Sequence, residues 1–357
     1  MKVSERKLFK GNEAVAEAAV RAGCRYFFGY PITPQNEIPE YMSRRLPEVG
    51  GCFLQAESEV AAINMVYGAA SAGARVMTSS SSPGISLKQE GISYIAGSLL
   101  SPLIVNMVRG GPGLGDIQPA QSDYFQATKG GGHGDYRLIV FAPASIQEMV
   151  DLIYISFETG EKYRMPVMIL ADGVLGQMME SVEFPAMKEP KDPKSSAYGV
   201  TGAQGRPARV VKAFDLDPEL MYNLNEKLAD TWKKAEESEV RVEEYLMDDA
   251  EFALVAYGTS SRICRSVVDK ARSEGVKLGL IRPITVWPFP KKAIGKAAGK
   301  VRGFLTVEMS LGQMVEDVRL AVDGKKPVYL HAVPGGLIPK RDEVLAQVKS
   351  IIQGKGV

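Results

Sequence analysis

An alternation of helical and extended patterns in the first half of the chain constrains its fold most strongly. Between residues 12 and 78, segments with helical apolar spacing alternate with short apolar runs that are typical of buried strands. The predicted helices are Asn12–Ala22, Gln35–Arg45 and Glu57–Ala72, and the predicted strands are Tyr26–Tyr30, Gly51–Gln55 and Arg75–Thr78. Such alternation is typical of βαβ units, so we expect an α/β fold with a mainly parallel sheet and helices on both faces.

The same pattern continues and then repeats after an interruption. Further strands are predicted at Leu103–Val108, Arg137–Phe141 and Val167–Leu170, and later at Phe252–Tyr257, Lys277–Ile281 and Phe304–Val307. Between the two sets, residues 181–249 form a polar segment with prolines, followed by one long charged helix predicted over Leu220–Leu246. A chain of 357 residues exceeds the usual size of one core. We therefore expect a domain over 1–180, a linker over 181–249 and a second domain over 250–357.

Composition excludes several classes of function. Lys plus Arg total 43 against 42 Asp plus Glu, so no positive field is expected to attract nucleic acid or a membrane. Charged residues follow Met1 directly with no apolar run, which indicates no secretory signal and a cytoplasmic protein. The cysteines, Cys24, Cys52 and Cys264, are too far apart to indicate a disulfide framework, a metal site or an iron–sulfur site.

Two carboxylates lie at the start of the helix predicted from Glu57. Glu59 shares its face with apolar residues at i+3, i+4, i+7 and i+11, whereas the face of Glu57 includes Asn64 and Gly68. Glu59 is therefore the carboxylate that we expect to be buried. A buried carboxylate without a charge partner has a raised pKa and can act as an acid. The alternative is a first-turn glutamate that complements the helix dipole.

Two hydroxyl-bearing motifs follow predicted strands. The run Thr78–Gly84 (TSSSSPG) places Ser81 where hydroxyls and free N–H groups commonly meet a polar ligand, although simple helix capping is an alternative. The run from Tyr30 to Pro34 (YPITP) is expected to hold Thr33 at the carboxyl edge of the sheet, where ligands bind in open α/β folds. A capping role for Thr33 is again the alternative.

A cation and a histidine stand in the glycine-rich region. Arg109 follows the strand ending at Val108, and its guanidinium suits bidentate binding of a substrate carboxylate, with a surface ion pair as the alternative. His133 lies in a glycine-rich run that could close over a site, and no second metal ligand is near it. The glycines do not form a dinucleotide fingerprint, because Asp116 stands at the third glycine position. A nicotinamide-dependent dehydrogenase is therefore disfavoured.

Three stretches together resemble the pyrimidine-binding domain of the 2-oxoacid:ferredoxin oxidoreductases. They are Tyr30–Pro34, Gln55–Gly68 (QAESEVAAINMVYG) and Thr78–Gly84. Later segments resemble the transketolase C-terminal domain: Tyr257–Thr259, Arg282–Pro290 (RPITVWPFP) and Val307–Met314 (VEMSLGQM). The resemblance implies a thiamine-diphosphate-binding fold followed by a transketolase C-terminal-like α/β domain. Within the family, the sequence is most similar to the α-type subunit of 2-oxoisovalerate (branched-chain) enzymes, with the α subunit of the 2-oxoglutarate enzyme as the alternative.

The resemblance also implies roles for particular residues. Glu59 matches the family acid that hydrogen-bonds N1′ of the aminopyrimidine, and Thr33 and Arg109 match positions that contact the substrate carboxylate and carbonyl. Tyr30, Pro31 and Ser81 lie in the matching motifs and are expected to contact the cofactor. The implied reaction converts a 2-oxoacid, coenzyme A and oxidised ferredoxin to acyl-coenzyme A, carbon dioxide and reduced ferredoxin.

One departure from the superfamily bears on the partners. The Gly-Asp-Gly motif that holds magnesium and diphosphate is represented only by the fragment Ala171-Asp172-Gly173, so no metal site is expected on this chain. The resemblance implies thiamine diphosphate shared with a β subunit, magnesium and iron–sulfur clusters on partners, and further γ/δ-type subunits. A non-catalytic scaffold subunit is the rival of another class, and it offers no reason for a carboxylate within an apolar helix face.

Overall fold

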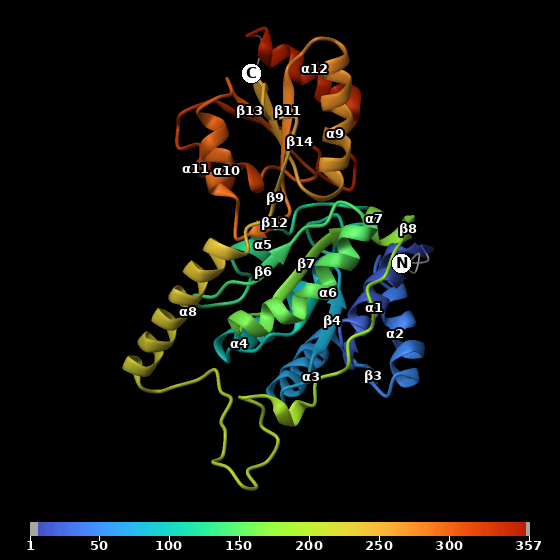
Figure 1. The fold of residues 1–357 in the computed structure, drawn as a ribbon, viewed down its shortest axis with the longest axis vertical. Helices are drawn as coiled ribbons and strands as arrows, with labels where there is room; N and C mark the ends of the chain where they lie inside the picture. The colour runs from blue at the N-terminus through green and yellow to red at the C-terminus, as the bar shows by residue number, and fades with distance from the viewer. Residues whose placement is uncertain (1–5, 355–357) are drawn as a thin grey trace.

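The computed structural model describes residues 6–354 and consists of two α/β units placed end to end along its long axis (Figure 1). The first residues of the chain, on which the expectation of no secretory signal largely rests, lie outside the described residues. Within the described part of the chain, no helix combines the length and the apolar character needed to cross a membrane.

The N-terminal unit is built on a seven-stranded sheet with the order β12-β6-β7-β5-β4-β2-β3 within residues 6–354. Its neighbouring strands run parallel except for β12, which pairs antiparallel with β6 at one edge. The strands are β2 Tyr26–Gly29, β3 Cys52–Gln55, β4 Val76–Ser80, β5 Leu103–Val108, β6 Ile139–Phe141, β7 Val167–Asp172 and β12 Thr285–Trp287. A small antiparallel pair joins β1 Lys7–Lys10 to β8 Met179–Val182. The predicted parallel α/β architecture is confirmed.

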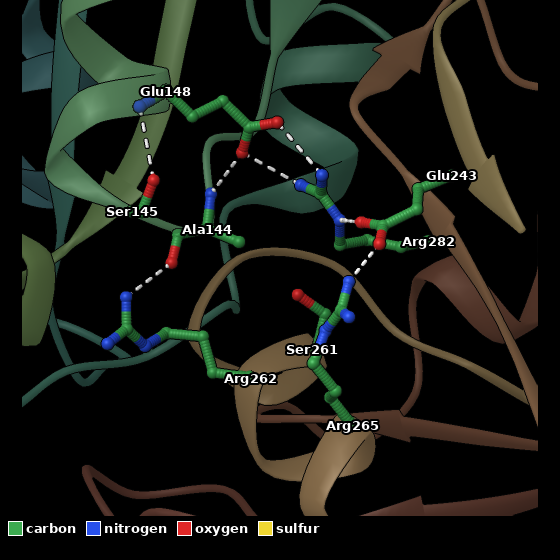
Figure 2. A pocket seen from close by; sticks show the side chains of 8 residues that line it. All are labelled: Ala144, Ser145, Glu148, Glu243, Ser261, Arg262, Arg265 and Arg282. Carbon is green, nitrogen blue, oxygen red and sulfur yellow. Dashed lines mark hydrogen bonds and ion pairs between the residues drawn. The ribbon is translucent and has the colours of Figure 1, made fainter. Parts of the chain in front are cut away.

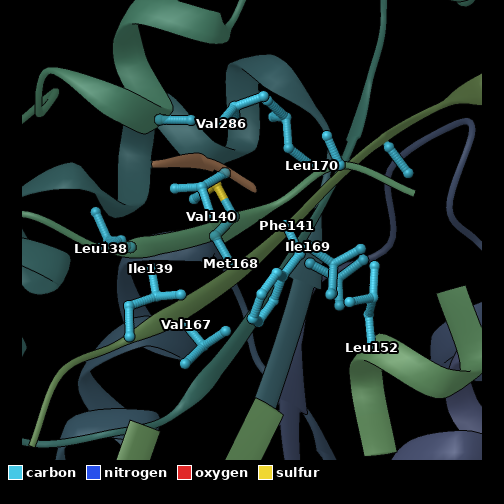
Figure 3. Close-up of a cluster of buried hydrophobic side chains, with 14 of the residues drawn as sticks. Leu138, Ile139, Val140, Phe141, Leu152, Val167, Met168, Ile169, Leu170 and Val286 are labelled. Carbon is cyan, nitrogen blue, oxygen red and sulfur yellow. The ribbon is translucent and has the colours of Figure 1, made fainter. Parts of the chain in front are cut away.

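Helices pack around this sheet in two groups. The helices are α1 Gly11–Arg21, α2 Glu37–Glu48, α3 Glu59–Ser71, α4 Ser82–Gly97, α5 Tyr124–Thr128, α6 Ile146–Tyr163 and α7 Gly173–Gln177. α3 packs on α4, whereas α1 packs on α2 and α6. Every residue of β5, β6 and β7 is buried, as expected for parallel strands covered on both faces. Figure 3 shows the aliphatic side chains of β6 and β7 packed together in this core.

The C-terminal unit has its own sheet, in the order β14-β13-β10-β11-β9 within the described residues. The strands are β9 Val242–Tyr245, β10 Phe252–Val255, β11 Leu278–Pro283, β13 Phe304–Glu308 and β14 Val328–Ala332. Its helices are α9 Gly258–Ser273, α10 Lys291–Ala298, α11 Met314–Val322 and α12 Arg341–Ile352. The three strands predicted after residue 250 correspond to β10, β11 and β13.

The segment predicted as a linker contains the predicted charged helix and a strand that the sequence pattern missed. The charged helix α8 spans Pro218–Ser238, after an extended stretch that includes the short 3₁₀ helix Pro193–Ser195 (Figure 1). The predicted continuation of this helix to Leu246 is wrong, because Val242–Tyr245 forms β9, antiparallel to β11. Pairing with a neighbouring strand overrides the helix preference of the two glutamates in this run.

The two units are joined by more than the linker. β12 comes from the second half of the chain but completes the N-terminal sheet. Gln121, fully buried, donates from Nε2 to the carbonyl of Tyr257 (2.9 Å) and accepts at Oε1 from Ser260 Oγ (2.7 Å) and from the Met309 amide (3.0 Å). These contacts hold α9 and the end of β13 against the carboxyl end of the N-terminal sheet.

Candidate active site

The predicted site residues follow three neighbouring strands of the N-terminal sheet. Tyr30 follows β2, Ser81 follows β4 and Arg109 follows β5, and these strands are adjacent in the order β5-β4-β2. From β2 the chain first moves outward to β3 and then returns to β4 on the other side of β2. The strand order therefore reverses between β2 and β4, which is where open α/β sheets commonly bind ligands.

Glu59 is buried, as the helical spacing predicted. It is the first residue of α3 and is 6% exposed, and it shares the buried stripe with Ala62, Ile63, Val66 and Ala70. Glu57 is exposed and lies before the helix, so the predicted start of the helix at Glu57 is wrong. The prediction that Glu59, rather than Glu57, is the buried carboxylate is confirmed. Within residues 6–354, the Glu59 carboxylate has no hydrogen-bond or ion-pair partner.

The beginning of α4 packs directly against Glu59. A Cβ placed on Gly84 would lie 2.6 Å from Glu59 Oε1 and 2.1 Å from Ser80 Oγ, so only glycine fits at this position. Two turns farther along, Gly91 allows a similarly close approach to Ile63 of α3. The glycines of α4 therefore bring the two helices together and hold the carboxylate against the end of β4.

Lys88 is a charged residue of this region that the sequence reasoning missed. Its side chain is fully buried, and its ammonium donates to Thr78 Oγ1 (2.8 Å) and to the carbonyl of Ser79 (3.0 Å). Burial lowers the pKa of Lys88 to about 7, and the negative charge of Glu59 opposes that fall. Lys88 is therefore an opposite charge that interacts electrostatically with Glu59, although no ion pair joins the two side chains among the described residues.

The YPITP loop is tied to the same strand end. Gln35, fully buried, donates from Nε2 to the carbonyl of Tyr30 (3.3 Å) and accepts at Oε1 from Ser79 Oγ (2.5 Å). Tyr30 is half-buried and Pro31 is exposed. Gln35 thus links the loop after β2 to β4 and fixes their relative position.

Thr33 and Arg109, which the sequence placed at one edge, are in contact. The guanidinium of Arg109 donates to the carbonyls of Thr33 (2.9 Å) and Leu114 (2.7 Å), and the residue is only 6% exposed. It makes no ion pair within the described residues, so the alternative of a surface salt bridge is wrong. Thr33 Oγ1 accepts from Asn36 Nδ2 (3.3 Å), and the helix cap of α2 is Asn36 rather than Thr33.

Several hydroxyl and guanidinium groups here are buried without partners among residues 6–354. Ser81 is the N-cap residue of α4 but makes no side-chain capping bond, and its hydroxyl, like that of Ser80, is unpaired. The Arg109 Nε is also unpaired. The next residue, Ser82, joins α4 to β5, because its hydroxyl accepts from the Arg109 amide (3.1 Å). Buried polar groups without partners are uncommon and indicate a site that a ligand completes.

The other candidates lie away from this cluster. His133 is exposed, its carbonyl accepts from Ser93 Oγ (2.7 Å), and its ring lies edge-on to Tyr94, more than two turns of α4 beyond Gly84. Asp172 caps α7 by accepting from the Val174 amide (2.9 Å). Within residues 6–354, no group of three or more His, Cys, Asp or Glu side chains is arranged to hold a metal.

Two cavities lie near the junction of the two units. One, of about 460 Å³, opens beside Thr33 and is lined mainly by apolar and amide side chains, including Ile117, Gln118 and Ile338. The other, of about 420 Å³, lies between the start of α6 and the C-terminal unit. Figure 2 shows Arg282 and Arg265 of this cavity paired with glutamates, whereas Arg262 donates to the Ala144 carbonyl. Neither cavity is lined by Glu59. The buried cluster at the strand ends differs from both cavities in holding buried polar groups that lack partners among the described residues.

In the charged cavity, Arg282 joins the two units. It donates to both Glu148 oxygens (2.8 and 2.9 Å) and to Glu243 (2.6 Å), and its side chain is 12% exposed (Figure 2). Burial acts to lower the pKa of Arg282, but the two carboxylates outweigh it and raise the pKa. With its cations satisfied by carboxylates, this cavity is a structural junction.

Comparisons with known proteins agree with the fold. Residues 17–244 match the thiamine-diphosphate-binding family of pyruvate flavodoxin/ferredoxin oxidoreductases, and residues 250–344 match core domain II of pyruvate:ferredoxin oxidoreductase. The chain is 51% identical to the ketoisovalerate oxidoreductase subunit VorB of Methanothermobacter marburgensis, over 97% of both chains. It is 37% identical to the 2-oxoglutarate synthase subunit KorA of the same organism, over 97% of this chain and 99% of that one.

Solved structures show the same relationship. A 2-oxoglutarate:ferredoxin oxidoreductase from Magnetococcus marinus, with 2-oxoglutarate, coenzyme A and succinyl-CoA bound, superposes with a TM-score of 0.87 at 25% identity, over 99% of this chain and 66% of that one. A split-gene transketolase, at 14% identity and a TM-score of 0.61, shares the fold. The chain therefore belongs to the 2-oxoacid:ferredoxin oxidoreductase family and carries the family's thiamine-diphosphate-binding domain.

Proposed function

We propose that this chain binds the aminopyrimidine of thiamine diphosphate in a branched-chain 2-oxoacid:ferredoxin oxidoreductase. The observation that carries the proposal is the carboxylate of Glu59, buried at a strand-order reversal and without a partner in the described chain. The bound cofactor supplies the carbon nucleophile and the electron sink that decarboxylation of a 2-oxoacid requires. The protein supplies the hydrogen bond from Glu59 to N1′ of the pyrimidine.

The cluster around Glu59 fits such a group. Gly84 leaves the carboxylate in contact with backbone, and the hydroxyls of Ser80 and Ser81 are buried and unpaired. A ring that carries both hydrogen-bond donors and acceptors satisfies a carboxyl and a hydroxyl at once. Tyr30 and Pro31 extend the lining from the loop that Gln35 ties to β4.

Arg109 and Thr33 are proposed to hold the substrate. A guanidinium has five N–H donors, and Arg109 uses two of its terminal nitrogens on backbone carbonyls. The remaining donors are available to a substrate carboxylate, and the Thr33 hydroxyl is near enough to accompany them because its own carbonyl accepts from Arg109. Two such contacts orient the carboxylate that leaves as carbon dioxide.

A branched-chain substrate is favoured by the relatives and by the cavity beside Thr33. A 2-oxoglutarate enzyme needs a second cation for the distal carboxylate, yet the described residues that line this cavity include no lysine or arginine. Its charged member is Glu37, whose carboxylate is already paired with Lys10. Ile117, Val174 and Ile338 offer apolar surface instead. The 51% identity to ketoisovalerate oxidoreductase subunits supports the same choice, with 2-oxoglutarate as the alternative substrate.

The proposal includes partner subunits. Val60, Met65 and Leu87, on α3 and α4 beside the buried cluster, are 44%, 37% and 54% exposed, and apolar exposure of this kind suits a protein interface. We assign the diphosphate and Mg²⁺ site and the iron–sulfur clusters to a β subunit and to γ/δ-type subunits, with coenzyme A and ferredoxin as co-substrates. The free cysteines support a cytoplasmic complex.

The test is a matched pair of substitutions in the complex reconstituted with its partner subunits. Glu59→Gln should lower the decarboxylation rate of 2-oxoisovalerate by about 10²-fold or more, as expected for loss of an acid–base group. Glu57→Gln, two residues away and exposed, should stay near the wild-type rate. A wild-type rate for Glu59→Gln contradicts the proposal, and a panel with 2-oxoglutarate in place of 2-oxoisovalerate identifies the substrate.

A further inference from the structure

The cavity beside Thr33 is closed on one side by the C-terminal unit. Among residues 6–354, the residues that line it belong to the N-terminal unit, with the exception of Ile338. Ile338 lies in the segment 333–340, which follows β14 and leads into α12. One unit therefore contributes an apolar side chain to a cavity that is otherwise built by the other unit.

Two glycines bring the segment 333–340 onto the loop at 110–118. Gly335 and Gly336 have φ angles of +74° and +81°, in the left-handed region that favours glycine. A Cβ on Gly336 would lie 2.6 Å from Gln118 Cβ, so the two segments are in direct contact. The isoleucine that lines the cavity is held two positions beyond this contact.

The loop at 110–118 is also tied to the residues proposed to hold the substrate. Arg109 donates to the carbonyl of Leu114 in this loop (2.7 Å) and to the carbonyl of Thr33 (2.9 Å), and Thr33 lines the cavity. Ile117, in the same loop, lines the cavity from the N-terminal unit. The apolar wall of the cavity is therefore fixed relative to the guanidinium proposed to bind the substrate carboxylate.

Both isoleucines of this wall are only partly covered by the chain. Ile117 is 56% exposed and Ile338 is 41% exposed. An apolar group that enters the cavity removes such surface from water, which favours binding. Leu337, the neighbour of Ile338, is 67% exposed but is not among the residues that line the cavity.

We propose that Ile338 is a specificity-determining residue that, together with Ile117, selects a branched side chain on the 2-oxoacid. The inference rests on the proposed function and deepens it, because it assigns part of the substrate selection to the C-terminal unit. With the substrate carboxylate held at Arg109 and Thr33, the opposite end of the substrate extends along the apolar wall. The branch methyls of 2-oxoisovalerate pack there, whereas pyruvate lacks them and gains less.

The test uses the reconstituted complex with 2-oxoisovalerate and pyruvate as paired substrates. The kcat/KM for each substrate is measured for wild type, Ile338→Ala and Ile117→Ala. Leu337→Ala is the matched control, because it shortens an adjacent and more exposed side chain that does not line the cavity. Thermal unfolding of each variant checks that it is folded.

The decisive quantity is the ratio of kcat/KM for 2-oxoisovalerate to kcat/KM for pyruvate. Ile338→Ala should lower this ratio about tenfold, because one lost methylene contact in an apolar pocket changes kcat/KM by about that factor or more. Ile117→Ala should lower the ratio in the same direction, and Leu337→Ala should leave it at the wild-type value. An isoleucine with a purely structural role would lower kcat/KM for both substrates by the same factor. An unchanged ratio in Ile338→Ala therefore overturns the inference, as does an equal fall in Leu337→Ala.

The two proposals fail in different ways. If Glu59→Gln keeps the wild-type decarboxylation rate, the proposed function is wrong whatever Ile338 does. If Glu59→Gln is inactive but the ratio in Ile338→Ala stays at its wild-type value, only the role of Ile338 is refuted.

Discussion

Replacing Lys88 by methionine should make the stability of the chain less dependent on pH. The folded protein lowers the pKa of this lysine from 10.5 to about 7, mainly through burial. At about 1.4 kcal/mol for each pKa unit, that difference corresponds to about 5 kcal/mol. This energy is the free energy by which folding disfavours the charged form of the Lys88 side chain.

The sign follows from proton binding. Above pH 10.5 the lysine is neutral in both the folded and the unfolded chain and costs nothing. As the pH falls toward 7, the unfolded chain binds a proton that the folded chain does not, so the wild type loses stability. Below about pH 7 both states are protonated and the cost stays constant.

Methionine removes this cost but also removes two hydrogen bonds. Thr78 Oγ1 and the carbonyl of Ser79 lose their donor, at about 1 kcal/mol each. We therefore expect Lys88→Met to be more stable than wild type by about 2 kcal/mol at pH 7 and slightly less stable at pH 10. The stability difference between Lys88→Met and wild type therefore changes by about 3 kcal/mol between pH 7 and pH 10. This change does not depend on the energy of the two lost hydrogen bonds, because that energy is the same at both pH values.

The assay is urea unfolding of both proteins at steps between pH 6 and pH 10, followed by fluorescence and circular dichroism. The exposed Lys292→Met serves as the control for loss of one surface ammonium. If the difference between Lys88→Met and wild type is the same at every pH, Lys88 titrates as it does in water. The argument from burial is then refuted.

Further predictions test the packing, the thiols and the junction. In Gly84→Ala, the new Cβ would lie 2.6 Å from Glu59 Oε1, so the variant should displace this carboxylate and lower the activity of the complex at least tenfold. Gly68→Ala is the control, because no atom lies near its Cβ, and it should leave stability unchanged or raise it by up to about 1 kcal/mol. Because burial raises the pKa of Cys24 to about 12, iodoacetamide at pH 8 should label the exposed Cys52 and spare Cys24 in the folded chain, as peptide mass spectrometry would show. Arg282→Met should destabilise the chain by about 3 kcal/mol, because it leaves the Glu148 carboxylate without a cation at the junction while Glu243 keeps Arg265, and calorimetry at pH 7 measures this.

Local patterns predicted the parts of the fold that depend on local physics. The apolar runs of β5 and β7 identified central strands, because strands covered on both faces have no polar alternation. Two strands depended on distant partners and were not predictable in this way. β9 contains two glutamates and is a strand only because β11 lies beside it, and β12 leaves its own half of the sequence to pair with β6.

The candidate site was predictable to a similar degree. The helical phase selected Glu59, and the strand-end rule placed Thr33 and Arg109 together, as their contact shows. The same phase argument would have found Lys88. Its neighbours at the helical spacings on α4 are all buried, and they are Gly84, Ile85, Gly91, Ile92 and Ile95. A lysine in the middle of an apolar stripe is as unusual as a glutamate in one, and no motif drew attention to it.

The buried apolar faces of α3 and α4 are more informative about the site when they are considered together. α3 and α4 pack on each other, and each buries one charge of opposite sign in its apolar face. A pair retained only for stability would be expected to close, since an open pair keeps the desolvation cost and forgoes most of the Coulomb energy. Here the lysine bonds to neutral groups of β4 and the glutamate has no partner among the described residues, so the arrangement leaves the carboxylate free to bind a ligand.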